Sequence, residues 1–334
     1  MTLLTIPSTI TRAEAFAQPD LLVQAFRHHG YVHVSGVVAE AELAVLRRET
    51  ASVLDVAVRS TPSVERPPGM GDGAYHRLVN DWVLQQRDSL PAVAQDTYYF
   101  PTARGLVPRA VDFIPHHCRS ARALLGHPGI LRLVEMMQGP AFILGATPMV
   151  VKMPGDGAEM PWHRDGLRPE DLDEEVPTFT AGVYLDDAVA ETAVRILPGS
   201  HRWTVERVQA ECRIRNGQRR YDDEAAVVAV PKAGDLLIHH TWVIHGSPAS
   251  QGPLRRVIYE SFTPLAVAAQ LLVDTQLHLG HRRIHLGMME RQYQDYAAEE
   301  MPYAYRCNLS AHDGTLRRWQ DLDPFRLHHG AFRR

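Results

Sequence analysis

The first 140 residues are dominated by apolar side chains that recur every three or four positions, the spacing of an amphipathic helix. The first such segment begins with Pro19, which suits the first turn of a helix, and it ends at Gly30. A short run of β-branched and aromatic residues follows and predicts a strand. The elements predicted for this part are helices over residues 19–29, 39–58 and 120–138 and a strand over 31–34.

After about residue 140 the pattern changes to short apolar runs that are separated by turns rich in glycine and proline. Several short strands at such spacing are typical of a β-sandwich or a small barrel. The predicted strands cover residues 141–145, 148–152, 179–185, 193–197, 226–230, 236–239, 242–245 and 257–262. Helical spacing returns from residue 266 to about 298.

These patterns predict a single domain over residues 1–334, with a mainly β core and flanking helices. The helical and mixed part covers 1–140, the β core about 141–263, and a helical C-terminal cap 264–334. The loop over 59–75, rich in proline and glycine, is not a linker between domains, because no independent core is complete before it.

Composition excludes several classes of protein. A hydrophobic content of 45% and a charged content of 22% are ordinary for a soluble globular enzyme, and a net charge of -4 offers no basic field for nucleic acid. The 3 cysteines form no Cys-x-x-Cys pair, which fits a reducing compartment. We find neither a signal peptide nor an apolar run long enough to span a membrane. We therefore expect a cytoplasmic protein without nucleic-acid or membrane partners.

Candidate metal ligands lie in a His-x-Asp triplet. In an extended strand the side chains of His163 and Asp165 would project from one face. Such a pair suits iron(II), manganese or zinc, and His245 would complete a two-histidine, one-carboxylate triad with open coordination positions. With 18 histidines and 39 acidic residues in the chain, the triplet alone also fits a surface turn beside a solvated carboxylate. His239 and His240 remain alternatives to His245 as the second histidine ligand.

Further motifs follow the triplet in a particular order. They are Tyr-Leu-Asp-Asp at 184–187, Glu-Thr-Ala-Val-Arg-Ile-Leu-Pro-Gly-Ser-His at 191–201, Lys-Ala-Gly-Asp-Leu-Leu-Ile at 232–238, and His-Gly-Ser at 245–247 with an arginine pair soon after it. With these motifs, and with its opening Gly-Tyr-Val-His-Val at 30–34, the sequence resembles the phytanoyl-CoA dioxygenase-like family of iron(II)/2-oxoglutarate oxygenases over most of 20–262. The resemblance implies a double-stranded β-helix, or jelly roll, whose open end holds the metal.

The resemblance also implies roles for single residues. The positions that match the family's iron ligands are His163, Asp165 and His245, each of which binds a metal in its deprotonated form. A strand arginine would clamp the far carboxylate of 2-oxoglutarate with two parallel hydrogen bonds. Arg256 fits the commonest family interval, whereas Arg255 fits the phase of the following strand. We favour Arg255, because the other phase would point Glu260 inward as an unpaired carboxylate.

Two more residues are expected to contact the cosubstrate, Thr192 and Met149. Some relatives place a threonine near position 194, and Thr192 lies two residues away on the same strand face. The chain also departs from the family pattern. It has Glu191 and Thr192 where relatives often have Asn-Gly, and Met160 where some have glutamine.

The activity implied by the resemblance uses iron(II), 2-oxoglutarate and dioxygen to oxidise a small molecule, with release of succinate and carbon dioxide. Hydroxylation is the default outcome. Halogenation is not expected, because related halogenases have a small residue where this chain has Asp165. The alternatives are a cupin-like zinc or manganese hydrolase or isomerase and a jelly-roll binding protein without catalysis. The hydrolase has no use for an arginine after the distal histidine.

The expected substrate is a small metabolite of specialised, natural-product metabolism, because no motif marks a coenzyme A or carrier-protein site. Irregular insertions over 61–75, 96–104 and 213–223 are predicted to line the mouth of the site. The candidate substrate residues are His76, Arg77, Tyr98, Arg164 and Trp203. A homodimer through the C-terminal helices is a further expectation.

Overall fold

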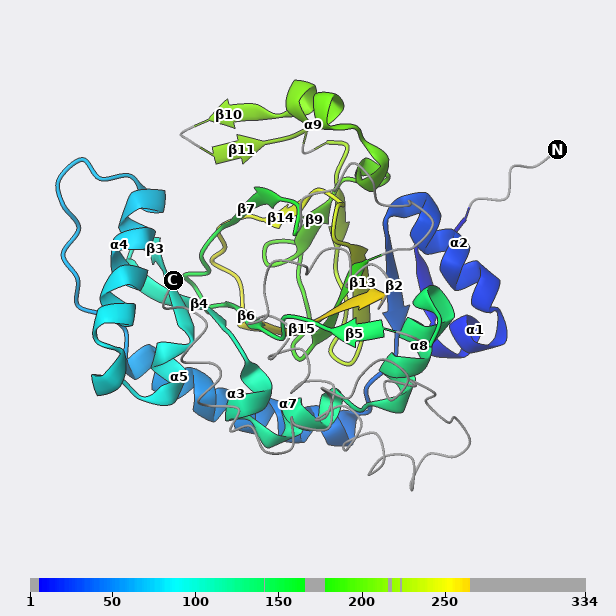
Figure 1. Ribbon diagram of the computed structural model, residues 1–334, viewed down its shortest axis with the longest axis horizontal. Coiled ribbons are helices and arrows are strands. Elements are labelled where there is room, and N and C mark those ends of the chain that lie inside the picture. Colours follow the sequence, from blue (N-terminus) through cyan, green and yellow to red (C-terminus); the bar gives the residue numbers. More distant parts are fainter. Residues whose placement is uncertain (1–5, 141, 166–177, 216–217, 223, 265–334) are drawn as a thin grey trace, which may run out of the picture.

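The computed structural model describes residues 6–140, 142–165, 178–215, 218–222 and 224–264. Two β-sheets lie at its centre, and helices of the N-terminal part surround the larger sheet (Figure 1). The predicted C-terminal cap, and the homodimer that it would form, lie outside the described residues. Within the described part of the chain, no helix is long and apolar enough to cross a membrane.

The N-terminal part is mainly helical. Its elements are β1 (Thr9–Thr11), α1 (Arg12–Ala17), α2 (Pro19–His29), β2 (Tyr31–Ser35), α3 (Glu40–Arg59), α4 (Asp72–Gln85), η1 (Arg87–Ser89), α5 (Ala92–Gln95), β3 (Thr97–Thr102), β4 (Gly105–Val111), α6 (Ile114–His117), α7 (Arg119–Leu124) and α8 (Pro128–Gln138). The predicted strand and the predicted helices of this part are confirmed. The last helix is divided into α7 and α8, and α8 begins at Pro128.

The following part is mainly strands. Its elements are β5 (Phe142–Leu144), β6 (Met149–Lys152), β7 (Met160–His163), β8 (Phe179–Tyr184), β9 (Val194–Ile196), η2 (Ser200–Arg202), α9 (Val205–Glu211), β10 (Arg213–Arg215), β11 (Gln218–Arg220), β12 (Val227–Ala229), β13 (Leu236–His240), β14 (His245–Ser247) and β15 (Arg255–Pro264).

Successive strands pass back and forth between the two sheets. The larger sheet has the order β1-β2-β13-β8-β15-β6-β4-β3, with β5 paired to β15, and the smaller has the order β12-β9-β14-β7. Along the chain, β6, β8, β13 and β15 join the larger sheet, whereas β7, β9, β12 and β14 join the smaller one. Antiparallel strands that alternate in this way form a double-stranded β-helix, so the predicted jelly roll is confirmed.

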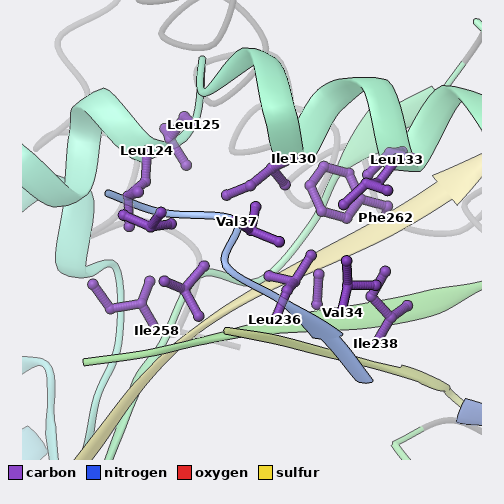
Figure 2. Close-up of a cluster of buried hydrophobic side chains, with 14 of the residues drawn as sticks. Val34, Val37, Leu124, Leu125, Ile130, Leu133, Leu236, Ile238, Ile258 and Phe262 are labelled. Atoms are coloured by element: carbon purple, nitrogen blue, oxygen red, sulfur yellow. The ribbon is translucent and has the colours of Figure 1, made fainter. Parts of the chain in front are cut away.

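The larger sheet is buried on both faces. Its outer face packs against α7 and α8, and the two sides contribute Val34, Leu236, Ile238, Ile258 and Phe262 from the sheet and Leu124, Leu125, Ile130 and Leu133 from the helices (Figure 2). Its inner face packs against the smaller sheet through a second cluster, which includes Leu237, Val257 and Ile196. Because both faces exclude water, β8 and β13 consist entirely of buried residues instead of alternating with polar ones.

Two glycines allow close approaches of the backbone. Gly30 ends α2 in the left-handed conformation with φ 77°, and a Cβ there would lie 2.3 Å from Nδ1 of His201. Gly234 has φ 87°, and a Cβ would lie 2.7 Å from the carbonyl oxygen of Val38. Both turns therefore require glycine, and the predicted end of the first helix at Gly30 is confirmed.

Several local predictions were wrong. The segment over 242–244 is a turn, and β14 begins only at His245. The insertion over 59–75 is shorter than expected, because α4 begins at Asp72. The segment over 96–104 contains β3, which pairs with β4 to extend the larger sheet. Prolines inside both strands, at positions 101 and 108, mask this hairpin in the sequence. Similarly, part of the segment over 213–223 forms the β10–β11 hairpin.

Arg256 ties the jelly roll to the helical layer. Its Nε and Nη2 donate to the two carboxylate oxygens of Asp186 at 2.9 and 2.8 Å. Its Nη1 donates to the carbonyl of Arg47 at 2.9 Å and to the hydroxyl of Thr50 at 3.1 Å, both on α3. The side chain of Arg256 is 5% exposed, so removing its one carboxylate would leave a charge that water does not compensate.

We predict that Asp186→Asn lowers the free energy of unfolding by about 3 kcal/mol, because it removes one partner of a buried ion pair. The neighbouring Asp187 supplies a matched control. Its side chain is 54% exposed and pairs with an exposed Lys232 at 3.0 Å, so Asp187→Asn should cost less than about 1 kcal/mol. Urea unfolding of the two variants measures the difference, and equal losses would contradict the structural role given to Arg256.

Candidate metal centre

The jelly roll brings together the three predicted metal ligands. His163 ends β7 and lies directly opposite His245 in the antiparallel pair of β7 and β14. Asp165 follows just beyond the strand, where its N–H donates to the carbonyl of Thr241 at 2.8 Å. Its Oδ1 lies 3.3 Å from Nε2 of His163 and 3.5 Å from Nε2 of His245. One ligand atom from each residue falls within 4.8 Å of the others, a spacing that suits a single metal ion.

Backbone carbonyls orient both imidazoles. Nδ1 of His163 lies 2.8 Å from the carbonyl oxygen of Pro161, and Nδ1 of His245 lies 3.1 Å from that of Val243. A carbonyl only accepts, so each Nδ1 carries a proton, and Nε2 of each ring is the atom that faces Asp165 and can bind a metal once it is deprotonated. Two imidazoles and a carboxylate that converge in this way are preorganised to bind a cation.

A third histidine, His239, holds the carboxylate. Its Nε2 lies 3.0 Å from Oδ2 of Asp165, and the hydroxyl of Thr180 donates to the same oxygen at 3.3 Å. These two residues face each other in the pairing of β13 with β8. Because Oδ2 is engaged, Oδ1 is the oxygen left for the metal. The alternative placement of His239 as the second histidine ligand is therefore not favoured, and its contact with Asp165 was missed.

His240, the other alternative, points away from the centre. Its ring stacks on Phe26 at 5.8 Å and lies 4.9 Å from the ring of Trp242. Neighbouring residues of β13 project to opposite faces, so only His239 reaches the interior of the roll.

The three ligands have unequal proton affinities. Burial would raise the pKa of Asp165, but the nearby His245, His163 and His239 hold it well below its ordinary value. Burial lowers the pKa of His245 to about 3, although Asp165 opposes this effect. Burial also acts to lower the pKa of His163, but its hydrogen bond and charge interaction with Asp165 outweigh it and raise the pKa. At neutral pH the site therefore offers a carboxylate and at least one neutral imidazole without any loss of protons.

Of the two candidate arginines, only Arg255 faces the metal centre. It lies on the inner face of β15 and is 1% exposed, and its Nη1 donates to the carbonyl of Thr192 at 2.8 Å. Its Nε is enclosed without a hydrogen-bond partner, and no carboxylate that the structure describes pairs with it. A buried cation without a counter-ion is costly unless a ligand supplies the missing charge. Arg256 makes the structural contacts described above and does not line the cavity.

The predicted strand phase is confirmed, but one reason for it was wrong. Val257, Tyr259 and Ser261 do share the inner face with Arg255, as expected. Glu260, which was expected to avoid burial in this phase, is instead 1% exposed on the outer face. Neither of its carboxylate oxygens has a hydrogen-bond partner among the described residues, and burial raises its pKa to about 8.

A buried lysine lies beside Arg255. Lys152 on β6 faces Arg255 in the register of β6 and β15, and it donates to the carbonyls of Ala158 and of Pro248, the latter at 2.7 Å. Burial and the charge of Arg255 lower the pKa of Lys152 to about 7. This end of the site is therefore positive, while the metal end carries the carboxylate. Sequence patterns did not identify Lys152, because its burial depends on the pairing of distant strands.

A cavity of about 290 Å³ extends from the metal ligands to Arg255. It is lined by Ala146, Pro148, Val150, Met160, His163, Asp165, Thr180, Val194, His239, His245, Gly246, Ser247, Arg255, Tyr259 and Ser261. The ring of Tyr259 lies over Gly182, where a Cβ would come within 2.7 Å of it. Gly182 therefore makes room for the tyrosine. Burial raises the pKa of Tyr259, so its hydroxyl stays protonated and can donate a hydrogen bond into the cavity.

The structure does not place the two other predicted cosubstrate residues in this cavity. The hydroxyl of Thr192 contacts the backbone of Val189 at 3.2 Å, and only its carbonyl meets Arg255. Met149 packs in the outer core beneath the helices, because its neighbour Val150 takes the inner face of β6. Thr192 therefore positions the arginine, and Met149 supports the fold.

The five predicted substrate residues also lie outside the cavity walls that the structure describes. Nδ1 of His76 contacts the carbonyl oxygen of Tyr99 at 2.9 Å, and Arg77 is exposed on α4. Tyr98 lines a separate cavity of about 90 Å³. Arg164 turns away from the metal ligands, and its Nη2 donates to the carbonyls of Ser200 and Trp203 at 2.7 and 3.3 Å. Trp203 itself packs beneath the guanidinium of Arg207.

Comparisons with known proteins relate the chain to one family. The family model of phytanoyl-CoA dioxygenase (PhyH) matches residues 26–257. Phytanoyl-CoA dioxygenase domain-containing protein 1 of Danio rerio is 23% identical over 267 residues, which cover 72% of this chain and 88% of that protein.

Solved structures with a similar fold include AviO1 from Streptomyces viridochromogenes Tue57. It has a TM-score of 0.52 and 20% identity, over 74% of this chain and 96% of that one. EctD from S. alaskensis with bound Fe has a TM-score of 0.50 and 15% identity, over 73% and 76% of the two chains. The chain spans half the length of EvdMO1, a further similar structure with 20% identity and a TM-score of 0.49 over 74% of this chain.

The matched region contains every residue from which the metal centre and its arginine are built. It covers more than half of the chain, and the similar solved structures agree in fold. The chain therefore belongs to the phytanoyl-CoA dioxygenase family.

Proposed function

We propose that this protein is an iron(II)- and 2-oxoglutarate-dependent oxygenase that acts on a small molecule. The observation that carries the proposal is the unpaired, buried guanidinium of Arg255 in the cavity that also contains the triad. A site that binds only a metal would not need such a group. Membership of the phytanoyl-CoA dioxygenase family supports the same activity.

The donor set fits iron(II). His163, Asp165 and His245 offer two nitrogens and one oxygen from one side, which leaves the cavity side open for other ligands. The carbonyls behind both imidazoles and the two donors behind Asp165 fix the orientation of each ligand.

The opposite end of the cavity fits the far carboxylate of 2-oxoglutarate. The guanidinium of Arg255 provides a planar fork for two hydrogen bonds, and the hydroxyl of Tyr259 provides a further donor nearby. Lys152 adds positive potential behind the arginine. The dicarboxylate would thus connect the positive end of the cavity with the metal.

With dioxygen as the oxidant, bound iron would couple oxidative decarboxylation of 2-oxoglutarate to succinate and carbon dioxide, which takes one oxygen atom, with oxidation of the substrate by the other. The protein residues supply orientation and exclude water. Thr180 and His239 keep Oδ2 of Asp165 engaged, so that a single oxygen faces the metal. Pro148, Val150 and Val194 form apolar walls that keep the reacting centre dry.

We further propose hydroxylation as the reaction and a metabolite of specialised metabolism as the substrate. Asp165 supports hydroxylation, because the carboxylate occupies the position that a halide would need. A cavity of about 290 Å³ suits a small molecule beside the cosubstrate. Reaction in the cytoplasm, without nucleic acid or membrane as partner, remains part of this proposal.

Two other functions fit the geometry less well. A zinc or manganese hydrolase of similar fold could use the triad but would leave Arg255 without a ligand. A binding protein without catalysis would not need two imidazoles and a carboxylate that converge on one point. Both alternatives leave the buried charge unexplained.

We predict that anaerobic addition of iron(II) and 2-oxoglutarate produces the weak visible charge-transfer band of the iron chelate. His245→Ala should abolish the band, because it removes one of three metal ligands. His28→Ala, which changes an exposed histidine on α2, should leave it intact. Absorption spectroscopy measures the band, and its absence from the unaltered protein would favour the hydrolase or the binding protein.

We predict that Arg255→Met raises the Kd for 2-oxoglutarate about a hundredfold, because a carboxylate would lose its buried charged partner. Arg255→Lys should cost less, since it keeps the charge but not the planar fork. The affinity for the metal alone should not change in either variant. Titration of the charge-transfer band gives the Kd, with Arg59→Met, a change of an exposed residue on α3, as control. An unchanged Kd in Arg255→Met would refute the clamp.

We predict that metal affinity depends on the release of one proton from His163, whose pKa is raised above its ordinary value. The pKa of His163 is raised above its ordinary value of 6.5, so a metal must displace a proton from it at lower pH. His245, with a pKa of about 3, is already neutral there. Affinity should be constant above the pKa of His163 and fall about tenfold per pH unit below it. Calorimetric titration with manganese(II) from about pH 5 to 8 tests this; release of two protons would contradict it.

A further inference from the structure

Arg109 lies at an irregularity of β4, in the hairpin that extends the larger sheet beyond β6. In the pairing of β3 with β4, Tyr98 faces Ala110 and Tyr99 faces Pro108, which leaves Arg109 without an opposite residue. Such a bulge re-aims a side chain out of the regular alternation.

The bulge directs Arg109 to the cavity side of the sheet. Ala110 pairs with Val150, and paired residues of antiparallel strands share a face, so both lie on the side that lines the cavity. Phe100, two residues after the partner of Ala110, is on that side as well. The guanidinium of Arg109 lies over the ring of Phe100, with Cζ 4.0 Å from its centroid.

Arg109 has no anionic partner among the residues that the structure describes. Its Nε is enclosed by protein without a hydrogen-bond acceptor, and neither terminal nitrogen donates to a described residue. Burial lowers the pKa of Arg109 to about 10, which still leaves it charged at neutral pH. Stacking on Phe100 covers one face of the guanidinium and leaves its donor edge free, as in arginines that bind oxyanions.

The charge of Arg109 reaches the reacting centre. It opposes the rise in the pKa of His163, a proposed iron ligand, and it adds to burial and Arg255 in lowering the pKa of Lys152 at the positive end of the cavity. Arg109 is not itself among the residues that line the cavity, but Arg109 and Arg255 are two separate cations whose charges both act on this site. Arg255 faces the cosubstrate end from β15, whereas Arg109 belongs to the β3–β4 hairpin, beyond β6 at the margin of the sheet (Figure 1).

Building on the proposed function, we propose that Arg109 binds an oxyanion of the substrate, so that the substrate is a small organic acid. The shared chemistry is a carboxylate or a phosphate monoester, either of which can accept two parallel hydrogen bonds from the guanidinium. With this group held at β4, the rest of the molecule extends over the aromatic and aliphatic side chains toward the metal. Arg109 thereby selects the substrate and sets which carbon is oxidised.

The test uses full-length protein that is loaded with nickel(II) in place of iron, to prevent turnover, and saturated with 2-oxoglutarate, to occupy Arg255. The probes are a series of straight-chain and aromatic monocarboxylates, their methyl esters, and the phosphate monoesters of the matching alcohols. Calorimetry gives the Kd of each probe for the unaltered protein and for Arg109→Gln and Arg109→Lys. Arg104→Gln changes an exposed arginine on the same hairpin and is the matched control.

We expect at least one acid or phosphate to bind about ten- to a hundredfold more tightly than its neutral counterpart. Arg109→Gln should remove this preference, Arg109→Lys should keep part of it, and Arg104→Gln should keep all of it. Selective binding of carboxylates or of phosphates identifies the oxyanion.

Two results would overturn the inference: no charged probe that binds more tightly than its neutral counterpart, or a full preference that persists in Arg109→Gln. If Arg109→Gln does not fold, a Kd in Arg109→Lys equal to that of the unaltered protein overturns it as well, since lysine lacks the planar fork.

The Kd of 2-oxoglutarate is measured on the same samples. Failure to bind 2-oxoglutarate would refute the proposed function, whereas normal 2-oxoglutarate binding without a preference for acids refutes only the role of Arg109.

Discussion

The site depends on the antiparallel pairing of β7 with β14, which places His163 directly opposite His245. The two histidines are far apart in sequence, and they meet because successive strands of the jelly roll pass between the two sheets. Asp165 joins them from just beyond the strand, where its N–H is held by the carbonyl of Thr241. From the larger sheet, β8 and β13 supply Thr180 and His239 to the same carboxylate.

Successive residues of β15 point to opposite faces of the sheet, so one face contributes to the binding cavity and the other to the stability of the fold. Arg255 and Arg256 are neighbours, yet one faces the cavity and the other forms a buried ion pair with Asp186. The same alternation places Glu260 among apolar residues of the outer core without a hydrogen bond from a described residue. Its raised pKa, about 8, means that it is largely protonated at neutral pH, which avoids most of the cost of a buried charge. Burial of Glu260 follows from the phase of β15 that places Arg255 in the cavity, because the opposite phase would place Arg255 outside it.

Features that depend on local spacing could be predicted from the sequence, namely the helices, the jelly-roll strands, the pair of His163 and Asp165, and the phase of Arg255. His245 could be added only through the resemblance to a known family, because local spacing does not relate it to that pair. Contacts that depend on pairing between distant strands could not. Lys152 and His239 acquire their roles only because β6 lies beside β15 and β13 beside β8. The substrate residues were predicted from irregular composition, but prolines masked the hairpin that contains Tyr98, and the lining of the cavity instead comes from regular strands. Arg109 was not predicted either, because the direction of its side chain depends on a bulge in the pairing of β3 with β4.

The charges around the cavity constrain what can bind there. An iron(II) ion with Asp165 carries one net positive charge, and Arg255 carries another. A doubly charged 2-oxoglutarate would neutralise both. The guanidinium of Arg109 would then remain as the uncompensated charge near the metal, with Lys152 contributing in part because its pKa is about 7. A neutral substrate would leave this cation desolvated when it closes off the cavity, whereas an acid would remove that cost. The same electrostatic argument that assigns a dicarboxylate to Arg255 therefore assigns a second, smaller anionic group to the substrate.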